Sequence, residues 1–175
     1  MLYNNIIDDS ILNVAKLMLV AAKTAPKARG RDNLVMTIAE KSDIVLLSKK
    51  MFEISENTGV DSFKRDAGNI LLSSYLVLIG TKIQTAGLLK CGMCGFANCE
   101  EKNKYKNTPC VFNTGDLGIA IGSAISIAMN HRVDNRIMYT VGQAAFELKI
   151  LGLDVPIIYG ISLSATAKNP FFDRK

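Results

Sequence analysis

Hydrophobic residues recur at helical intervals in two segments near the start of the chain. The first segment can be capped by Asp9 or Ser10 and is stopped by Pro26, and the second can be capped by Ser42 and ends near Gly59. Residues three and four apart share one face of a helix, so each segment predicts an amphipathic helix. The predicted buried faces consist of Ile11, Leu12, Ala15, Leu19 and Ala22 in the first helix and of Ile44, Leu47, Met51 and Ile54 in the second.

Short apolar segments between these helices indicate the strands of a small sheet. The predicted strands are 34–39, 74–80 and 155–161, and the second is so apolar that we expect it to be fully buried. Further helices are predicted at about 61–72, at 113–130, and from Asp134 or Thr140 through Leu151. Because helices and strands intermingle and helix dominates, we expect one α/β (α+β) domain over residues 1–175, with a small sheet packed between helices.

The composition indicates a folded protein and argues against nucleic acid or a membrane as a partner. Hydrophobic residues make up 49% and charged residues 21%, which supplies enough apolar surface for a core. The formal net charge of +5 comes from scattered basic residues, with no aromatic-rich basic stretch that could bind nucleic acid. The apolar stretch 117–129 is shorter than the roughly twenty residues that span a bilayer, and no signal peptide is visible. We therefore expect a cytoplasmic protein with reduced cysteines.

All four cysteines lie in one loop, 90–111, with the spacing C-x2-C-x4-C-x10-C. Thiolates are soft ligands that select zinc and iron–sulfur centres. Structural zinc commonly uses two C-x2-C pairs, and only the first pair here has that spacing, whereas a cluster tolerates one loop that supplies three ligands and a fourth from further along. The pattern therefore favours a 4Fe–4S cluster, with zinc and unligated thiols as the alternatives. The candidate ligands are Cys91, Cys94, Cys99 and Cys110.

Residues between the cysteines fit a cluster-binding loop. Gly92 and Gly95 each follow a candidate ligand, where the absence of a Cβ lets backbone N–H groups turn toward the sulfurs. Met93 and Phe96 can supply apolar cover. Such cover and such hydrogen bonds tune the reduction potential of a cluster.

The segment Cys91-Gly-Met-Cys-Gly-Phe-Ala-Asn-Cys99 resembles a prokaryotic family of uncharacterised ferredoxin-domain proteins. The resemblance covers nearly the whole chain, with further matching blocks at 25–32, 116–124, 133–142 and 160–174. The family in turn is similar to a shortened nitroreductase-like fold. That resemblance implies a dimeric α+β sandwich, with a small mixed sheet between helices and an inserted four-cysteine loop. Elsewhere this fold holds FMN at the subunit interface, so the resemblance implies a homodimer and makes FMN a candidate cofactor.

A basic loop follows the first predicted helix, and nitroreductase-like enzymes use such a loop to contact the flavin phosphate and ribityl chain. The basic residues stand at alternate positions, Lys27, Arg29 and Arg31. Alternate side chains of an extended loop point the same way, so three cations can converge on one anion, and arginine grips phosphate in a bidentate manner. Asn33 can contact an edge of the flavin. The alternative is a solvated loop, or arginines that pair with Asp32 and Asp66.

A glycine-rich segment opens the helix predicted after the cysteines. Helix N-termini favour anions, but Asp116 already stands in the predicted first turn, and the glycine spacing is not G-x-G-x-x-G. The four-residue interval between Gly118, Gly122 and Ser126 therefore predicts close helix packing rather than a phosphate site.

No side chain is predicted to be catalytic. The one histidine, His131, is expected to cap helix carbonyls, and the polar cluster 134–136 is predicted to be a helix-start turn. Neither a nucleophile–base constellation nor a nicotinamide fingerprint is present, so a cofactor must carry any chemistry. We therefore expect an iron–sulfur redox protein that transfers electrons to an unidentified partner or acts as an FMN-dependent oxidoreductase. The alternative is a non-enzymatic binding or structural module whose cysteines hold zinc.

Overall fold

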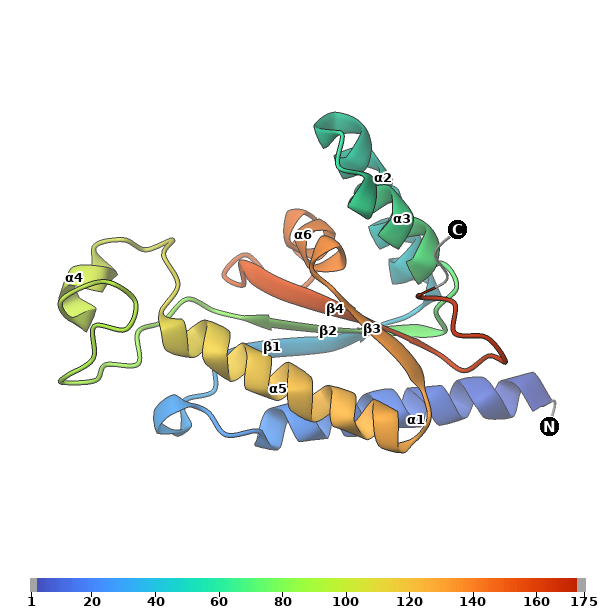
Figure 1. Cartoon of the computed structure of the whole chain (residues 1–175), viewed down its shortest axis with the longest axis horizontal. Coiled ribbons are helices and arrows are strands. Elements are labelled where there is room, and N and C mark those ends of the chain that lie inside the picture. Colours follow the sequence, from blue (N-terminus) through green and yellow to red (C-terminus); the bar gives the residue numbers. More distant parts are fainter. Residues whose placement is uncertain (1–2, 173–175) are drawn as a thin grey trace.

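The centre of the molecule is a four-stranded sheet with helices on both faces (Figure 1). The computed structural model describes residues 3–172. In chain order the strands are β1 (Leu34–Ala39), β2 (Tyr75–Thr81), β3 (Asp134–Met138) and β4 (Ile157–Ser164). They pair in the order β1-β2-β4-β3, and all three pairs are antiparallel. The α/β class is confirmed, whereas the expected mixture of strand directions is wrong.

Two helical layers enclose the sheet. On one face α1 (Tyr3–Thr24) packs beside α5 (Val111–Asn130). On the other face lie α2 (Lys41–Thr58), α3 (Asp61–Ile70) and α6 (Tyr139–Glu147). Because α2 and α3 form a helical hairpin, the chain returns to the end of the sheet from which it left, and β2 must run antiparallel to β1.

Strand β2 is buried on both faces, as its sequence predicts. Val77 and Ile79 pack under α1 and α5, whereas Leu76 and Leu78 face α2, α3 and α6. Successive side chains of a strand point to opposite faces, so a strand that is covered on both sides must be apolar at every position. This requirement explains the unbroken apolar run.

The first two helices begin earlier than their capping residues predicted. Within the described residues α1 begins at Tyr3, so Asp9 and Ser10 lie inside the helix. Helix α2 is capped by Glu40 and not by the predicted Ser42. The carboxylate of Asp43 accepts a hydrogen bond from the Glu40 amide at 3.2 Å, which completes a capping box. The predicted end of α2 is confirmed.

The polar cluster Asp134–Arg136 was predicted as a helix-start turn, and this prediction is wrong. These residues form β3, the edge strand that pairs with β4. An edge strand is partly exposed and tolerates polar residues, so it lacks the apolar signature that identified β1 and β2.

Asp66 of α3 joins three elements in the core, and it is only 3% exposed. Its carboxylate accepts a hydrogen bond from Thr140 Oγ1 at 2.7 Å and lies 3.7 Å from Arg136 Nη2 of β3. The Arg136 guanidinium also donates to the Phe171 carbonyl at 2.6 Å, which holds the end of the described chain. The expectation that Asp66 pairs with the basic loop is therefore wrong, because Arg136 and the adjacent Arg65 surround it.

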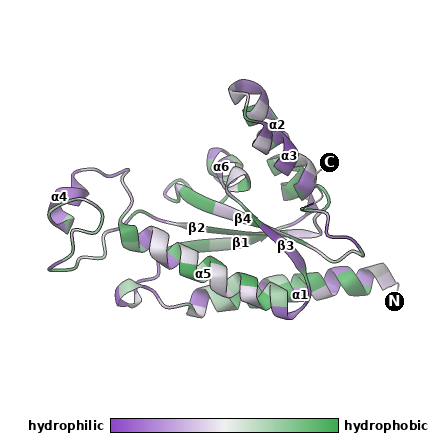
Figure 2. Ribbon diagram, viewed as in Figure 1, coloured by the Kyte–Doolittle hydropathy of each residue, from purple (hydrophilic) through white to green (hydrophobic). Residues whose placement is uncertain are grey.

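Helix α5 is the most apolar helix of the fold (Figure 2). Among residues 3–172 it is the one helix that is long and apolar enough to cross a membrane, by length and composition alone. Leu117, Ala120 and Ala124 on one side of it are buried against α1 and the sheet. The same test is passed by core helices of folded domains, and the burial of this side agrees with the predicted core helix.

The small residues Gly118, Gly122 and Ser126 lie on the opposite, exposed side of α5. A Cβ placed on either glycine would meet nothing within 4 Å in this chain. Close helix packing across this stripe was predicted, and no helix among residues 3–172 of the same chain supplies it. The apolar side of α5 provides the contact with α1 instead.

Helix α6 packs against β4 at a contact that only glycine permits. A Cβ on Gly142 would overlap the backbone carbonyl of Ile158. We predict that Gly142→Ala lowers the free energy of unfolding by at least about 2 kcal/mol, because backbone rather than a movable side chain must give way. Gly68→Ala is the matched control. A Cβ there meets nothing within 4 Å, so stability should rise by about 0.5–1 kcal/mol. Chemical denaturation of both variants measures the difference, and equal stabilities would contradict the predicted clash.

Candidate functional site

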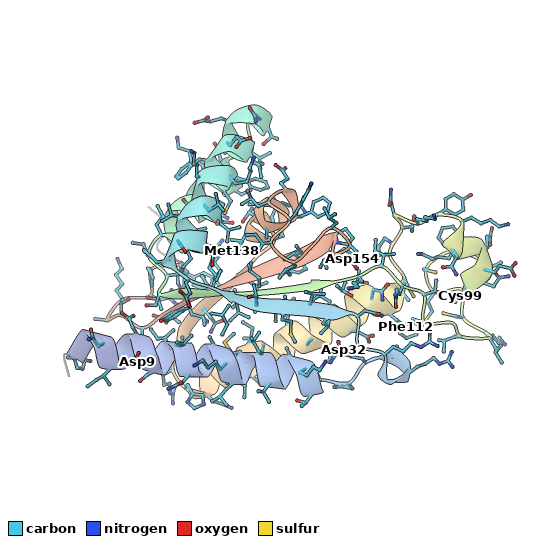
Figure 3. The ribbon with its side chains drawn as sticks, turned by 180° about the vertical axis from the view of Figure 1, so that it is seen from behind. Asp9, Asp32, Cys99, Phe112, Met138 and Asp154 are labelled. Carbon is cyan, nitrogen blue, oxygen red and sulfur yellow. The ribbon has the colours of Figure 1, made fainter. Side chains whose placement is uncertain are left out.

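The four cysteines lie in a lobe that projects beyond one end of the sheet (Figure 1). We call residues 90–111 the cysteine lobe. Its one helix is the short α4 (Cys99–Asn103), which the Asn98 side chain caps by accepting a hydrogen bond from the Glu101 amide at 2.9 Å. Seen from behind, Cys99 lies out on the lobe, and Phe112 marks its base, where α5 begins (Figure 3).

All four cysteines are free thiols, but they occupy two kinds of environment. Cys91, Cys94 and Cys99 are partly exposed, whereas Cys110 is 4% exposed and caps the N-terminus of α5. Helix α5 therefore begins at Val111, directly after the last cysteine, and not at 113–116 as predicted. Three thiols thus belong to the outer part of the lobe, and the fourth is buried where the lobe joins α5.

The two glycines of the lobe adopt left-handed backbone conformations. Gly92 and Gly95 have φ values of 85° and 86°, a region that favours glycine. The Gly95 amide donates to the Gly92 carbonyl at 3.0 Å, which turns the chain sharply between Cys91 and Cys94.

The donor set of the lobe fits a thiolate-bound metal centre, because four free thiols and two turn-forming glycines share one short loop. Their arrangement in the structure is open. Within residues 3–172 no three His, Cys, Asp or Glu side chains lie close enough together to hold a metal ion. The four cysteines therefore share one lobe, but no three of their sulfurs lie close enough together to bind one metal ion in this structure.

The basic loop divides into two parts with different contacts. Lys27 turns back onto α1, where Nζ donates to the carbonyls of Ala22, Lys23 and Ala25 at 2.8–3.0 Å. The loop then forms a short 3₁₀ turn, η1 (Ala28–Gly30). This turn breaks the extended conformation that would have aligned the three basic side chains, so Lys27 does not join the two arginines.

Arg29 and Arg31 converge on the chain that leads into the cysteine lobe. Arg29 Nη1 donates to the carbonyls of Gly87 at 2.7 Å and Ala86 at 3.3 Å. Arg31 Nη1 also lies within hydrogen-bond distance of the Ala86 carbonyl, at 3.4 Å. These carbonyls precede Cys91 by only four and five residues. Two candidate sites about sixty residues apart in the sequence are therefore neighbours in space.

Other contacts fix the loop against the body. The Asp116 carboxylate accepts a hydrogen bond from the Ala28 amide at 3.1 Å, so this acid serves the basic loop rather than the start of α5. The Asn33 carbonyl accepts from the Lys82 amide at 3.0 Å, at the point where the chain leaves β2 for the lobe.

Asp32 pairs with Lys23 of α1 and not with an arginine of the loop, so this part of the predicted alternative is also wrong. Partial burial alone would raise the pKa of the Asp32 carboxyl, but hydrogen bonds from Lys23 and the Leu34 amide lower that pKa below its usual value. Asp32 therefore stays charged, and its negative charge is paired with Lys23 rather than with Arg29 or Arg31.

An apolar hollow of about 370 Å³ lies between the basic loop and the cysteine lobe. Its walls come from the basic loop, from the first turns of α5 and from Met93 of the lobe. The lining residues are Pro26, Lys27, Ala28, Met93, Val111, Phe112, Gly115, Asp116 and Ile119. Sequence reasoning did not single out Phe112 or Ile119. Their only signal was their position in the helix that follows the last cysteine.

Several solved structures with a similar fold are described as containing FMN. A nitroreductase with bound FMN from Desulfitobacterium hafniense aligns with a TM-score of 0.61 and 13% identity, over 93% of this chain and 82% of that one. A nitroreductase with bound FMN from Bacteroides fragilis aligns with a TM-score of 0.60 and 12% identity, over 95% and 81% of the two chains. At identities this low, the alignments show the fold alone. The shared nitroreductase-like fold confirms the fold expected from the sequence.

Closer relatives identify the family. An uncharacterised protein from Archaeoglobus fulgidus is 34% identical over 174 residues, which cover 95% of this chain and 93% of the relative. Residues 106–174 match the family described as "Uncharacterized protein containing a ferredoxin domain (DUF2148)", a range that includes Cys110. The chain therefore belongs to this family of proteins that contain a ferredoxin domain.

Proposed function

We propose that this protein is an iron–sulfur redox protein with one 4Fe–4S cluster on Cys91, Cys94, Cys99 and Cys110. The observation that carries the proposal is the gathering of four free thiols and two turn-forming glycines in one short lobe. The hydrogen bonds of Arg29 and Arg31 to the Ala86 and Gly87 carbonyls hold the basic loop beside this lobe. The ferredoxin domain of the family supports the same proposal.

The residues of the lobe can support a cluster in two ways. A 4Fe–4S cluster supplies one-electron transfer, and its potential depends on hydrogen bonds to sulfur and on exclusion of water. The chain turns tightly at Gly92 and Gly95, beside Cys91 and Cys94. The Gly95 amide donates to the Gly92 carbonyl, so the other amides of this turn would donate to sulfur. The Phe96 ring packs against that of Tyr105, with 5.2 Å between the ring centroids, and adds apolar surface to the lobe.

We also propose that FMN binds beside the lobe, with its phosphate at Arg29 and Arg31. The FMN-bound nitroreductases of the same fold support this part of the proposal. The apolar hollow lined by Met93 and Phe112 is suited to a flat ring between the two candidate sites. Asn33 directly precedes β1 and follows Arg31 by two residues, and we propose that its side chain contacts an edge of the flavin. With both cofactors bound, the chain would act as a flavin-linked oxidoreductase or as an electron carrier.

We propose a cytoplasmic homodimer, because reduced thiols suit that compartment and an apolar surface is open on α5. A groove of about 330 Å³ follows the glycine stripe of this helix and the neighbouring strands. It is lined by Thr114, Leu117, Gly118, Ile121, Gly122, Ile137, Ile157 and Tyr159. A second copy of the chain that packs against this groove would bury it and give the glycines the close contact that one chain lacks.

The cluster is tested by the iron and acid-labile sulfide content of protein purified without oxygen. We expect about four of each per chain, and a brown absorbance that dithionite bleaches. Cys99→Ser should lose most of the iron, because one thiolate ligand is removed. Thr108→Ser is the matched control, since it changes a residue of the lobe and keeps every thiol. Colourless protein with one zinc ion per chain would contradict the cluster and support the structural zinc module.

The flavin site is tested by FMN titration followed through fluorescence quenching. Arg29→Ala and Arg31→Ala should each weaken FMN binding about tenfold, the effect of losing one charge-assisted hydrogen bond of about 1.4 kcal/mol. Lys16→Ala is the control. It removes an exposed cation of α1 that lines neither the hollow nor the basic loop, so FMN affinity should stay the same. Unchanged FMN affinity in both arginine variants would refute the phosphate assignment.

The dimer is tested by light scattering of Gly118→Leu at several protein concentrations. A leucine on the open stripe should raise the dimer dissociation constant at least about tenfold, because it separates helices that glycine lets approach. Gly68→Leu adds the same side chain at an open position of α3 and should leave the dimer intact. A monomeric parent protein, or a dimer unaffected by Gly118→Leu, would rule out this interface.

A further inference from the structure

A lysine occupies the most buried position in the outer part of the cysteine lobe. Lys102 of α4 is only 2% exposed. Between residues 90 and 109 it is the only buried residue, since the three outer cysteines and Phe96 are all partly exposed. The proposed cluster ligands and the proposed flavin contacts do not include this lysine, so its burial needs another explanation.

The hydrophobic effect does not explain why Lys102 is buried. A lysine is almost never fully buried unless its ammonium group is paired, because removing a charge from water is costly. The same part of the chain exposes large apolar side chains: Leu89 is fully exposed, Met93 is 68% exposed and Tyr105 is 56% exposed. Burial of any of these side chains in place of the lysine would be favourable, so the lysine side chain must be held inside by its charge.

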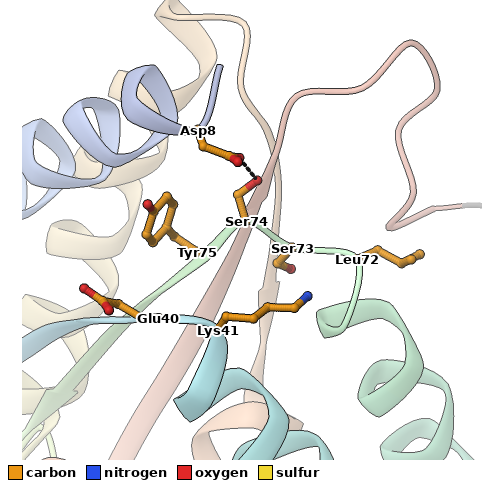
Figure 4. Close-up of a pocket in the computed structure, with 7 residues that line it drawn as sticks. All are labelled: Asp8, Glu40, Lys41, Leu72, Ser73, Ser74 and Tyr75. Carbon is orange, nitrogen blue, oxygen red and sulfur yellow. Dashed lines mark hydrogen bonds between the residues drawn. The ribbon is translucent and has the colours of Figure 1, made fainter. Parts of the chain in front are cut away.

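The Lys102 ammonium group has no anionic partner in the protein. Within the part of the chain that the structure describes, its Nζ forms no hydrogen bond and no ion pair. The Glu101 carboxylate accepts from the Ala97 amide at 2.8 Å, and Glu100 is exposed. Even the exposed Lys41, beside a polar pocket at the other end of β1, donates to the carbonyl of the residue that caps α3, at 2.7 Å (Figure 4). Lys102 is thus a buried cation that requires an anion.

Lys102 and the candidate ligand Cys99 lie on the same face of α4. Residues three apart on a helix are neighbours on its surface, and the burial of Lys102 shows that this face is turned into the lobe. Cys99 is partly buried, and its Sγ lies 4.0 Å from the Leu88 carbonyl, in the chain that leads into the lobe. The interior of the lobe therefore contains candidate thiolate ligands and one unpaired ammonium group.

We propose that the Lys102 ammonium group is the counter-charge of the cluster and raises its reduction potential. This inference rests on the proposed 4Fe–4S cluster. A cluster held by four thiolates has a net negative charge, which grows when one electron is added, and the net charge is one of the factors that set the potential. A buried cation is little screened by water and salt, so it stabilises the reduced cluster more than the oxidised one. Lys102 supplies this charge and is not itself a ligand.

Anaerobic redox titration of the full-length protein tests the proposal, with Lys102→Met as the variant. Methionine keeps a long side chain at this position and removes its charge. At a fixed ambient potential we expect the ratio of reduced to oxidised cluster to fall at least about tenfold, which corresponds to a midpoint potential lower by about 59 mV for one electron. Lys102→Arg retains the charge and should restore most of this ratio.

Lys104→Met is the matched control, because it removes the same charge from an exposed lysine two residues away. Its effect on the ratio should stay below about twofold, since an exposed charge is screened. If Lys102→Met and Lys104→Met have equal effects in protein that contains the cluster, the inference is overturned and the proposed cluster stands.

Iron content decides the remaining outcomes. Loss of iron from Lys102→Met but not from Lys102→Arg would support the counter-charge, because the arginine variant keeps the positive charge. Loss of iron from both variants would assign the position to packing and overturn the inference. Parent protein without iron would refute the proposed cluster, and this inference with it.

Discussion

The antiparallel register of β1 and β2 is the constraint on which the arrangement of this protein depends. Leu34 is opposite Thr81, so the residues that precede β1 lie beside those that follow β2. The basic loop comes just before Leu34, and the chain toward the cysteines begins just after Thr81. Because both faces of β2 are apolar, side-chain size rather than polarity fixes this register. A Cβ at Gly80 would lie 2.6 Å from Val155 and 2.9 Å from Ile158, so a slip by one residue would force a side chain into occupied space. The register in turn brings the basic loop and the cysteine lobe together.

Hydrogen bonds at this end of the sheet then attach the basic loop to the chain that leads into the cysteine lobe. Arg29 has a positive φ of 57°, which is uncommon for a residue other than glycine and persists only where the surroundings require it. The requirement comes from both sides of the residue, since Asp116 holds the Ala28 amide and the Arg29 guanidinium holds the Gly87 carbonyl. The same backbone turn that aims Arg29 at the lobe separates it from Lys27. One strained residue thus decides which of the three basic side chains can act together.

The sequence predicted those parts of the fold whose burial is reflected in a regular pattern. Strand β1 has the predicted limits, and β2 and the apolar faces of α1 and α2 lie where their periodicity placed them. Strand β3 was missed because an edge strand with Asp134 and Arg136 carries no such pattern. The alignment of Lys27 with the arginines failed for a different reason. Side chains alternate in direction only where the chain is extended, and here a 3₁₀ turn interrupts it. Neither this turn nor the distant Gly87 carbonyl that binds Arg29 can be recognised from the residues of the loop itself.

The two ends of β1 differ in their charged side chains. Arg29 and Arg31 stand at the end near the lobe, whereas Asp8 and Glu40 stand at the other end beside Lys41. Leu76, Val77, Leu78 and Ile79 of β2 are fully buried between the two ends, so the apolar core separates the two groups of charges. The uncompensated positive charge therefore lies at the end near the lobe, where it favours an anion such as the phosphate of the proposed flavin.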